Sequence, residues 1–240
     1  MASLQTAPPQ SFSGVQAEAD AEMFDVFDEN EMHQGTQPRS VCHRNGLWHR
    51  AVYALLMNKQ QELLIQRRSA QKKVSPEKWD LSAAEHLQPG ETYLHAAARG
   101  LIEELGVSLP PTQGSTPASI IVEGSTESSH SGVQGEGHNS CSHRETAASR
   151  IPDLCARLKG PLAPRHPRQL DIPETGIKDY EFVETYSFEG YNGPVMYNSE
   201  EVSEVAWISI PELARRMKDK PDDFTPWFLC EARTLDWLGS

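Results

Sequence analysis

The feature that most constrains the fold is an amphipathic pattern over residues 91–105 that ends at a glycine. Apolar residues recur there at spacings of three and four, which places one face of a helix against a core: Leu94, Ala97, Ala98, Leu101 and Leu105. Thr92 suits the N-cap of this helix, and Gly106 suits the left-handed residue at its end. Glu103 and Glu104 share a second face with Gly100. The pattern therefore predicts a helix that carries carboxylates away from its core face.

Carboxylates in a row on one helix face suit a hard divalent cation. Mg²⁺ takes oxygen ligands and keeps several waters. A bound metal neutralises diphosphate charge and lowers the pKa of a bound water. Arg99 can pair with Glu103 or with Glu91 and so orient the carboxylates. The alternative is a solvated helix face, since glutamate is common on exposed helix surfaces.

Residues 85–107, EHLQPGETYLHAAARGLIEELGV, resemble the Nudix box, G-x5-E-x7-R-E-u-x-E-E-x-G-u, where u is aliphatic. Seven positions are in register: Glu91, Arg99, Leu101, Glu103, Glu104, Gly106 and Val107. Glu85 stands where the first glycine belongs, and Gly100 stands where a glutamate normally binds metal in the family. Glycine supplies no ligand and costs about 1 kcal/mol in a helix interior. We expect Glu85 to replace the missing ligand in part.

Other segments resemble the isopentenyl-diphosphate-isomerase-like branch of this superfamily, which contains both hydrolases and isomerases. They are MFDVFDEN (23–30), CHRNGLWHRAVYALL (42–56), ELLIQRRSAQKKVSPEKWDLSAAEH (62–86), DYEFVETY (179–186) and EEVSEVAWISIPEL (200–213). We expect strands near 48–57, 62–67, 119–123, 180–188 and 204–210, and helices at 91–105, 211–218 and 225–238. Mixed strands with helices on each side predict an α/β fold, the α/β/α sandwich with a mixed β-sheet of the Nudix superfamily.

The resemblance also implies metal ligands outside the helix. Isomerases of this branch bind metal through histidines near the first strands and a carboxylate pair on a later strand. His49 and His86 stand at matching positions, and His43 lies one residue out of register. For His43 alone we favour a structural side chain with a satisfied hydrogen bond. Asp179 and Glu181 project from one strand face, and we expect Glu181 to complete the metal site.

One position separates the two chemistries of the branch. Isomerases need a cysteine two residues before the position of His86, and Ala84 stands there. A methyl group transfers no proton, which favours hydrolysis. Isomerases also lack the box glutamate at the position of Gly100, so this second departure favours isomerisation. We give the missing cysteine more weight.

A basic run lies between a predicted strand and the box: Arg67, Arg68, Lys72, Lys73 and Lys78. Arginine binds phosphate through two parallel hydrogen bonds. Alternation along the strand turns either Arg67 or Arg68 inward, and we expect that arginine to bind the substrate. For the lysines we favour a solvated loop.

Composition predicts one domain and two polar segments, a tail before the domain and an insertion within it. Residues 1–22 are expected to be a disordered acidic tail, and residues 23–240 a Nudix domain with a low-complexity insertion at about 110–173. A net charge of −12 disfavours nucleic-acid binding, and no apolar run reaches the roughly 20 residues of a membrane span. The first 38 residues hold seven acidic and no basic residues, unlike a signal or transit peptide. We expect a cytoplasmic protein.

These observations predict a hydrolase that uses Mg²⁺ or Mn²⁺ to cleave a small organic diphosphate. Glu103, Glu104, Glu181 and Glu85 are the predicted metal ligands. Arg99 and Glu91 would orient them, and Glu104 or a metal-held water network would activate the nucleophile. Two alternatives stay open: a non-catalytic module that binds a diphosphate or a partner protein, and an isopentenyl-diphosphate isomerase.

Overall fold

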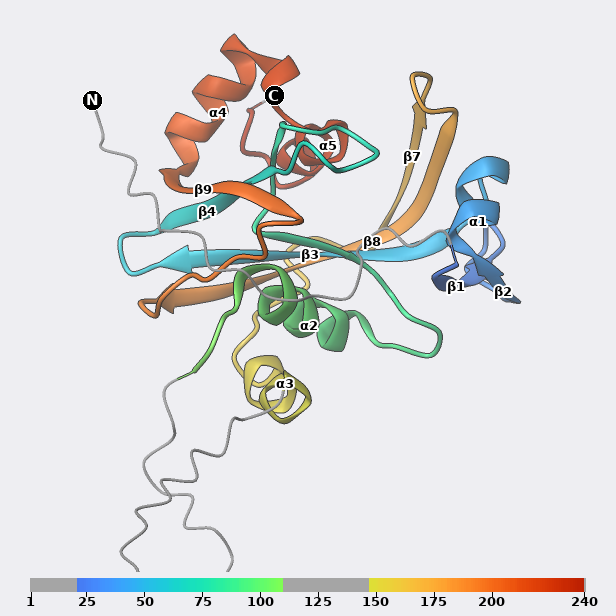
Figure 1. Ribbon diagram of the computed structural model, residues 1–240, viewed down its shortest axis with the longest axis horizontal. Coiled ribbons are helices and arrows are strands. Elements are labelled where there is room, and N and C mark those ends of the chain that lie inside the picture. Colours follow the sequence, from blue (N-terminus) through green and yellow to red (C-terminus); the bar gives the residue numbers. More distant parts are fainter. Residues whose placement is uncertain (1–20, 110–146, 240) are drawn as a thin grey trace, which may run out of the picture.

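The computed structural model describes residues 21–109 and 147–239. A seven-stranded mixed sheet forms its centre (Figure 1). Its strands are β3 (His49–Asn58), β4 (Glu62–Arg68), β5 (Trp79–Asp80), β6 (Ala83–His86), β7 (His166–Ile172), β8 (Ile177–Tyr191) and β9 (Val202–Ser209). β3 pairs in parallel with β8 and antiparallel with β4 and β6. β7 extends the sheet beyond β8, whereas β5 and β9 pair with β4.

Helices cover both faces of this sheet. They are α2 (Tyr93–Leu105) and α3 (Ala147–Cys155) on one face, and α4 (Ile210–Asp219), α5 (Pro226–Thr234) and the short 3₁₀ helix η1 (Pro221–Asp223) on the other. Alternation along β3 divides the apolar residues between two cores. Val52 and Ala54 pack in the core with α2 and α3, whereas Tyr53 and Leu55 pack in the core with α4 and α5. The predicted α/β/α sandwich with a mixed sheet is confirmed.

A small N-terminal unit lies against one end of β3 and β8 (Figure 1). It contains the hairpin of β1 (Met23–Phe27) and β2 (His33–Pro38), followed by α1 (Arg39–Asn45). Gly46 ends α1 in a left-handed conformation with φ of 64°. A Cβ atom there would lie 2.9 Å from the ring of Tyr180 on β8, so glycine allows the helix to approach the strand closely. This approach brings His43 of α1 to the sheet.

The predicted caps of the box helix are confirmed. The Thr92 hydroxyl accepts a hydrogen bond from the amide of His95 (3.3 Å), and Gly106 adopts a left-handed conformation with φ of 61°. The loop that follows β8 also fixes the end of α2, because the amides of Met196 and Asn198 donate to the carbonyls of Leu105 and Glu104. α2 is therefore held at both ends.

The C-terminal part of the predicted insertion contains regular secondary structure. Residues 147–155 form α3, and residues 166–172 form β7. Ile151 and Leu154 are buried against the α2 core, and β7 pairs along its length with β8. The mean composition of residues 110–173 is polar. It therefore did not indicate that two apolar side chains of this segment are buried or that backbone pairing stabilises a strand within it. The predicted strand at 119–123 and most of the predicted tail lie outside the described residues.

The last helix is shorter than predicted, because α5 ends at Thr234. Within the described ranges, no helix combines the length and apolar character needed to cross a membrane.

Candidate active site

A cavity of about 360 Å³ lies between the N-terminal unit, the sheet and α2. Side chains from the box helix line one part of it, and histidines and carboxylates from α1, β6 and β8 line another. The cavity therefore contains two clusters of chemically active groups, which β6 joins through the adjacent residues Glu85 and His86.

Arg99 organises the first cluster from the centre of α2. Its guanidinium donates to both carboxylate oxygens of Glu91 at 3.0 Å and to Glu85 at 2.9 Å. It also donates to Glu103 at 3.3 Å and to the carbonyl of His86 at 3.0 Å. The two pairings expected from the sequence, with Glu91 and with Glu103, are both present. Arg99 is buried, so this network fixes the carboxylates relative to β6.

Glu104 is the most enclosed carboxylate of the box. Gln66 of β4 donates to one oxygen at 2.5 Å, and the amide of Ala84 on β6 donates to the other at 3.1 Å. Burial, together with the charges of Glu85 and Glu201, raises the pKa of Glu104 well above its ordinary value of 4.5. Such crowding of carboxylates is relieved when a cation binds among them.

Glu85 occupies the space that a side chain at position 100 would need. A Cβ atom on Gly100 would lie 2.6 Å from Cγ of Glu85. The sequence therefore shows a reciprocal exchange. Glu85 on β6 stands where the box pattern has glycine, Gly100 on α2 stands where it has glutamate, and the two positions face each other. A carboxylate is retained at this place in the cavity, but it comes from the strand.

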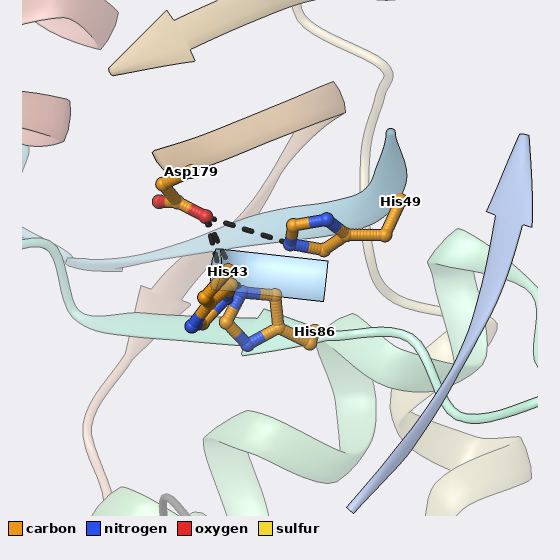
Figure 2. Close-up of side chains that lie close together, drawn as sticks. All are labelled: His43, His49, His86 and Asp179. Atoms are coloured by element: carbon orange, nitrogen blue, oxygen red, sulfur yellow. Dashed lines mark ion pairs between the residues drawn. The ribbon is translucent and has the colours of Figure 1, made fainter. Parts of the chain in front are cut away.

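The second cluster has the geometry of a metal site. His43, His49 and His86 point toward Asp179, and their ligand atoms all lie within 4.8 Å of one another (Figure 2). The distances from the three Nε2 atoms to Asp179 Oδ1 are 3.6, 3.4 and 3.9 Å, respectively. Glu181 lies beside them, 3.0 Å from His86 Nε2. The three histidines and Asp179 come from α1, β3, β6 and β8, and they converge in Figure 2.

Several observations indicate that this cluster fits a cation. All three Nε2 atoms and Asp179 Oδ1 are buried and hydrogen-bonded to none of the described residues. His49 Nδ1 donates to the carbonyl of Leu47 at 2.9 Å, which leaves the Nε2 lone pair facing the cluster. Burial, with the charges around it, lowers the pKa of His43 to about 2, so the imidazole is neutral. The interpretation of His43 as a satisfied structural side chain is therefore wrong.

Two features tune the remaining ligands of this cluster. Burial and Arg39, whose Nη1 lies 3.3 Å from His86 Nδ1, oppose protonation of His86, but Asp179 and Glu181 raise its pKa to about 9 and so hold a proton on Nε2. A cation that binds His86 Nε2 would displace this proton. Burial opposes ionisation of Asp179, but contacts with His49, His86 and Arg168 hold its pKa well below the ordinary value. Imidazole nitrogens favour a transition metal over Mg²⁺.

The structure separates the members of the basic run. Arg68 lines the cavity, where it pairs with buried Asp80 at 3.3 Å. Arg67 points outward, donates to the carbonyl of Glu77 and lies 3.8 Å from Glu204. The inward arginine expected from alternation is therefore Arg68. The prediction of a solvated loop is wrong for Lys72, whose side chain is 12% exposed and lies 3.5 Å from Glu201 in the cavity.

Comparisons with known proteins identify the class of fold and domain. The structure matches a crystal structure of a protein from Deinococcus radiodurans with a TM-score of 0.54 and 20% sequence identity, over 89% of this chain and 99% of that one. The NUDIX domain family model matches residues 47–131. The chain therefore contains a match to the NUDIX domain on a Nudix-like fold.

Its relatives carry two kinds of name. An uncharacterized Nudix hydrolase of Pseudomonas aeruginosa is 43% identical over 91 residues, which cover 38% of this chain and 54% of that protein. Nudix hydrolase 3 of Arabidopsis thaliana is 44% identical over 37% of this chain, but only 12% of that protein is matched. An isopentenyl-diphosphate Delta-isomerase of Pectobacterium atrosepticum is 28% identical over 88% of this chain and 90% of that protein. The resemblance to this branch is confirmed, and the family supports in general a hydrolase that acts on diphosphates.

Sequence reasoning missed several cavity residues. Glu201 precedes β9, and Arg168 and Tyr53 come from β7 and β3. Glu201 lay in a segment that carried the family resemblance, but nothing in its local pattern distinguished it from neighbouring glutamates. Only sheet pairing brings these residues to one cavity.

Proposed function

We propose that this protein is a divalent-metal-dependent hydrolase that cleaves an organic diphosphate. The observation that carries the proposal is the exchange of Glu85 and Gly100. It keeps a third carboxylate beside Glu103 and Glu104 in the cavity, although the box glutamate is absent from the helix. Loss of the box glutamate without replacement would leave the site short of one carboxylate. With Glu85 in its place, the site keeps the oxygen ligands that Mg²⁺ or Mn²⁺ needs.

Each residue of the first cluster has a distinct role in this proposal. Glu85, Glu103 and Glu104 would hold the cation, which supplies charge neutralisation at the diphosphate and an acidified water. Arg99 and Glu91 orient these carboxylates through the hydrogen bonds described above. Glu104 would accept the proton of the attacking water, because burial and the neighbouring carboxylates raise its pKa and so strengthen it as a base. Arg68 lines the same cavity and contributes positive charge toward the phosphates.

The second cluster would hold a second, different cation. His43, His49, His86, Asp179 and Glu181 supply nitrogen and oxygen ligands, a mixture that Mn²⁺ accepts more readily than Mg²⁺ does. Glu181 therefore acts as a metal ligand in this cluster, together with histidines, instead of completing the shell of Glu103 and Glu104. The whole cavity would bind a small-molecule diphosphate in the cytoplasm.

Isomerisation is the second candidate, because relatives named isopentenyl-diphosphate Delta-isomerase align over most of this chain. The histidine cluster is compatible with this activity. Ala84, however, lines the cavity where the isomerases place a cysteine. Cys42, Cys155 and Cys230, the free cysteines of the described residues, lie outside the cavity lining, so none of them substitutes for the missing thiol.

Phosphate release by the purified chain across a panel of organic diphosphates tests the proposal, with Mg²⁺ and with Mn²⁺. The panel includes isopentenyl diphosphate. We expect turnover by the wild type and a loss of kcat of at least about tenfold in Glu104→Gln. Glu174→Gln is the matched control, because this exposed glutamate lies in the turn between β7 and β8.

Three other outcomes contradict the proposed base or the proposed reaction. Loss of less than tenfold in Glu104→Gln would remove the proposed base. Conversion of isopentenyl diphosphate to its isomer without phosphate release would favour the isomerase. Binding of diphosphates without any turnover would favour a non-catalytic module.

A further inference from the structure

Two polar side chains in the cavity are buried without complete hydrogen bonding. Arg168 of β7 is 7% exposed, and Tyr53 of β3 is 2% exposed. Nε and Nη1 of Arg168 and the hydroxyl of Tyr53 make no hydrogen bond to any part of the chain that the structure describes. Both side chains line the cavity, and the guanidinium lies over the Tyr53 ring, 5.3 Å from its centroid. Buried donors without partners are rare in folded proteins, so these three groups indicate a ligand.

The third nitrogen of Arg168 explains how the side chain is held. Nη2 donates to Asp179 Oδ2 at 3.2 Å and to Glu181 Oε2. The opposite oxygens of these carboxylates face the histidines. Arg168 therefore buttresses the second cluster with one edge and presents Nε and Nη1 as free donors. The carboxylates fix the orientation of these donors before any ligand binds.

The chemistry of this place specifies the ligand. A guanidinium only donates hydrogen bonds, so the ligand must present an acceptor. Asp179 and Glu181 already place two negative charges against Arg168, which disfavours another anion and favours an uncharged oxygen. The Tyr53 ring, whose centroid lies 5.3 Å from the guanidinium carbon, suits the carbon atoms beside such an oxygen. A carbonyl group on an apolar organic moiety meets these requirements.

We propose that Arg168 and Tyr53 form a specificity subsite for a carbonyl oxygen on the organic part of the substrate. This inference rests on the proposed diphosphate chemistry of the cavity and narrows its substrate class. An isoprenoid diphosphate, whose tail has no acceptor, would leave the buried donors unpaired. The subsite therefore selects carbonyl-bearing organic diphosphates over isoprenoid ones.

Two probes of nearly identical shape test the subsite. 4-Oxopentyl diphosphate carries a carbonyl oxygen where 4-methylpent-4-enyl diphosphate carries a methylene group. Binding of each to the full chain is measured by calorimetry, with Ca²⁺ as the cation so that no turnover is required. We expect the wild type to bind the ketone about tenfold more tightly than the alkene, as the gain of one buried hydrogen bond implies.

Variants then assign this preference to the two side chains. Tyr53→Phe removes only the hydroxyl, and Arg168→Lys keeps the charge against Asp179 and Glu181 but removes the planar donors. We expect each to reduce the preference for the ketone several-fold. Tyr53→Phe should leave alkene binding unchanged, because the alkene makes no hydrogen bond to the Tyr53 hydroxyl. Tyr186→Phe is the control, because its hydroxyl donates to Glu184 and the residue lies outside the cavity lining.

Equal affinity of the wild type for the two probes would overturn the subsite, as would an equal loss of both in Tyr53→Phe. Because binding is measured without cleavage, absence of hydrolysis in the panel would contradict the proposed reaction and leave the subsite standing. Failure of both probes to bind would overturn the subsite together with the diphosphate site.

Discussion

At the scale of single residues, the relation between Glu85 and Gly100 decides how the departures from the box are interpreted. Either departure alone removes a consensus residue. Because the two positions face each other, the strand supplies the carboxylate that the consensus places on the helix, and Gly100 provides the space for it. The helix accepts the lower propensity of Gly100 because a larger residue would displace Glu85 from Arg99.

This relation predicts that the effect of Gly100→Ala on the free energy of unfolding changes sign when Glu85 is removed, which a double-mutant cycle measures. In the wild type, Gly100→Ala forces Cγ of Glu85 away and lowers the free energy of unfolding by about 1–3 kcal/mol. In a Glu85→Ala background the clash is absent, so the same substitution raises the free energy of unfolding by about 1 kcal/mol through helix propensity. Urea denaturation of the four proteins measures both effects. An identical effect in both backgrounds would show that Glu85 does not occupy this space.

At the scale of elements, Glu91 joins the start of α2 to its interior. One oxygen accepts from the amide of Gln88 at 2.9 Å, the other contacts His95 Nδ1 at 2.8 Å, and Arg99 donates to both. Burial of Glu91 alone would raise its pKa, but these hydrogen bonds lower the pKa below the ordinary 4.5. The ionised carboxylate therefore stabilises the folded helix.

The sign of this shift predicts a pH dependence. A carboxylate with a lowered folded-state pKa contributes stability above its unfolded pKa, and this contribution is lost as the pH falls toward the folded pKa. We expect Glu91→Gln to be less stable than the wild type at neutral pH, with a difference that stays constant down to about pH 4.5 and shrinks below it. Denaturant unfolding at successively lower pH measures the difference. A difference that grows on acidification would contradict the role of Glu91.

At the scale of the whole molecule, the histidine cluster ties the N-terminal unit to the sheet. His43 comes from α1, His49 from β3, His86 from β6 and Asp179 from β8. Phe24 of β1 stacks on His49 and His86 with centroid distances of 5.0 and 4.6 Å. A cation bound here would link four elements and stabilise their arrangement.

Metal addition should therefore raise the thermal stability of the chain. Mn²⁺ at about a hundredfold over its Kd would stabilise the folded state by about 2.7 kcal/mol per site, measured as a rise in Tm. His49→Gln removes a buried ligand and should reduce this rise and abolish one Mn²⁺ site in a calorimetric titration. The exposed residue His33 provides the control, since His33→Gln leaves the cluster intact. Equal Mn²⁺ binding by His49→Gln and the wild type would exclude the cluster as a metal site.

Sequence patterns predicted the box helix, its caps and the three-layer architecture. The caps at Thr92 and Gly106 and the apolar face of α2 involve residues within a few positions of one another. They can therefore be recognised from the sequence alone. Alternation also predicted that Arg67 and Arg68 diverge, but not which of them enters the cavity.

The contacts between side chains in the cavity could not be predicted from the sequence, because they depend on the tertiary fold. Glu85 and Gly100 are close in sequence, yet their contact depends on how α2 packs against β6. His43 reaches Asp179 because α1 packs on β8, and Arg168 reaches Glu181 because β7 pairs with β8. Local periodicity does not predict such contacts, because sheet register and helix packing between segments far apart in the chain determine them.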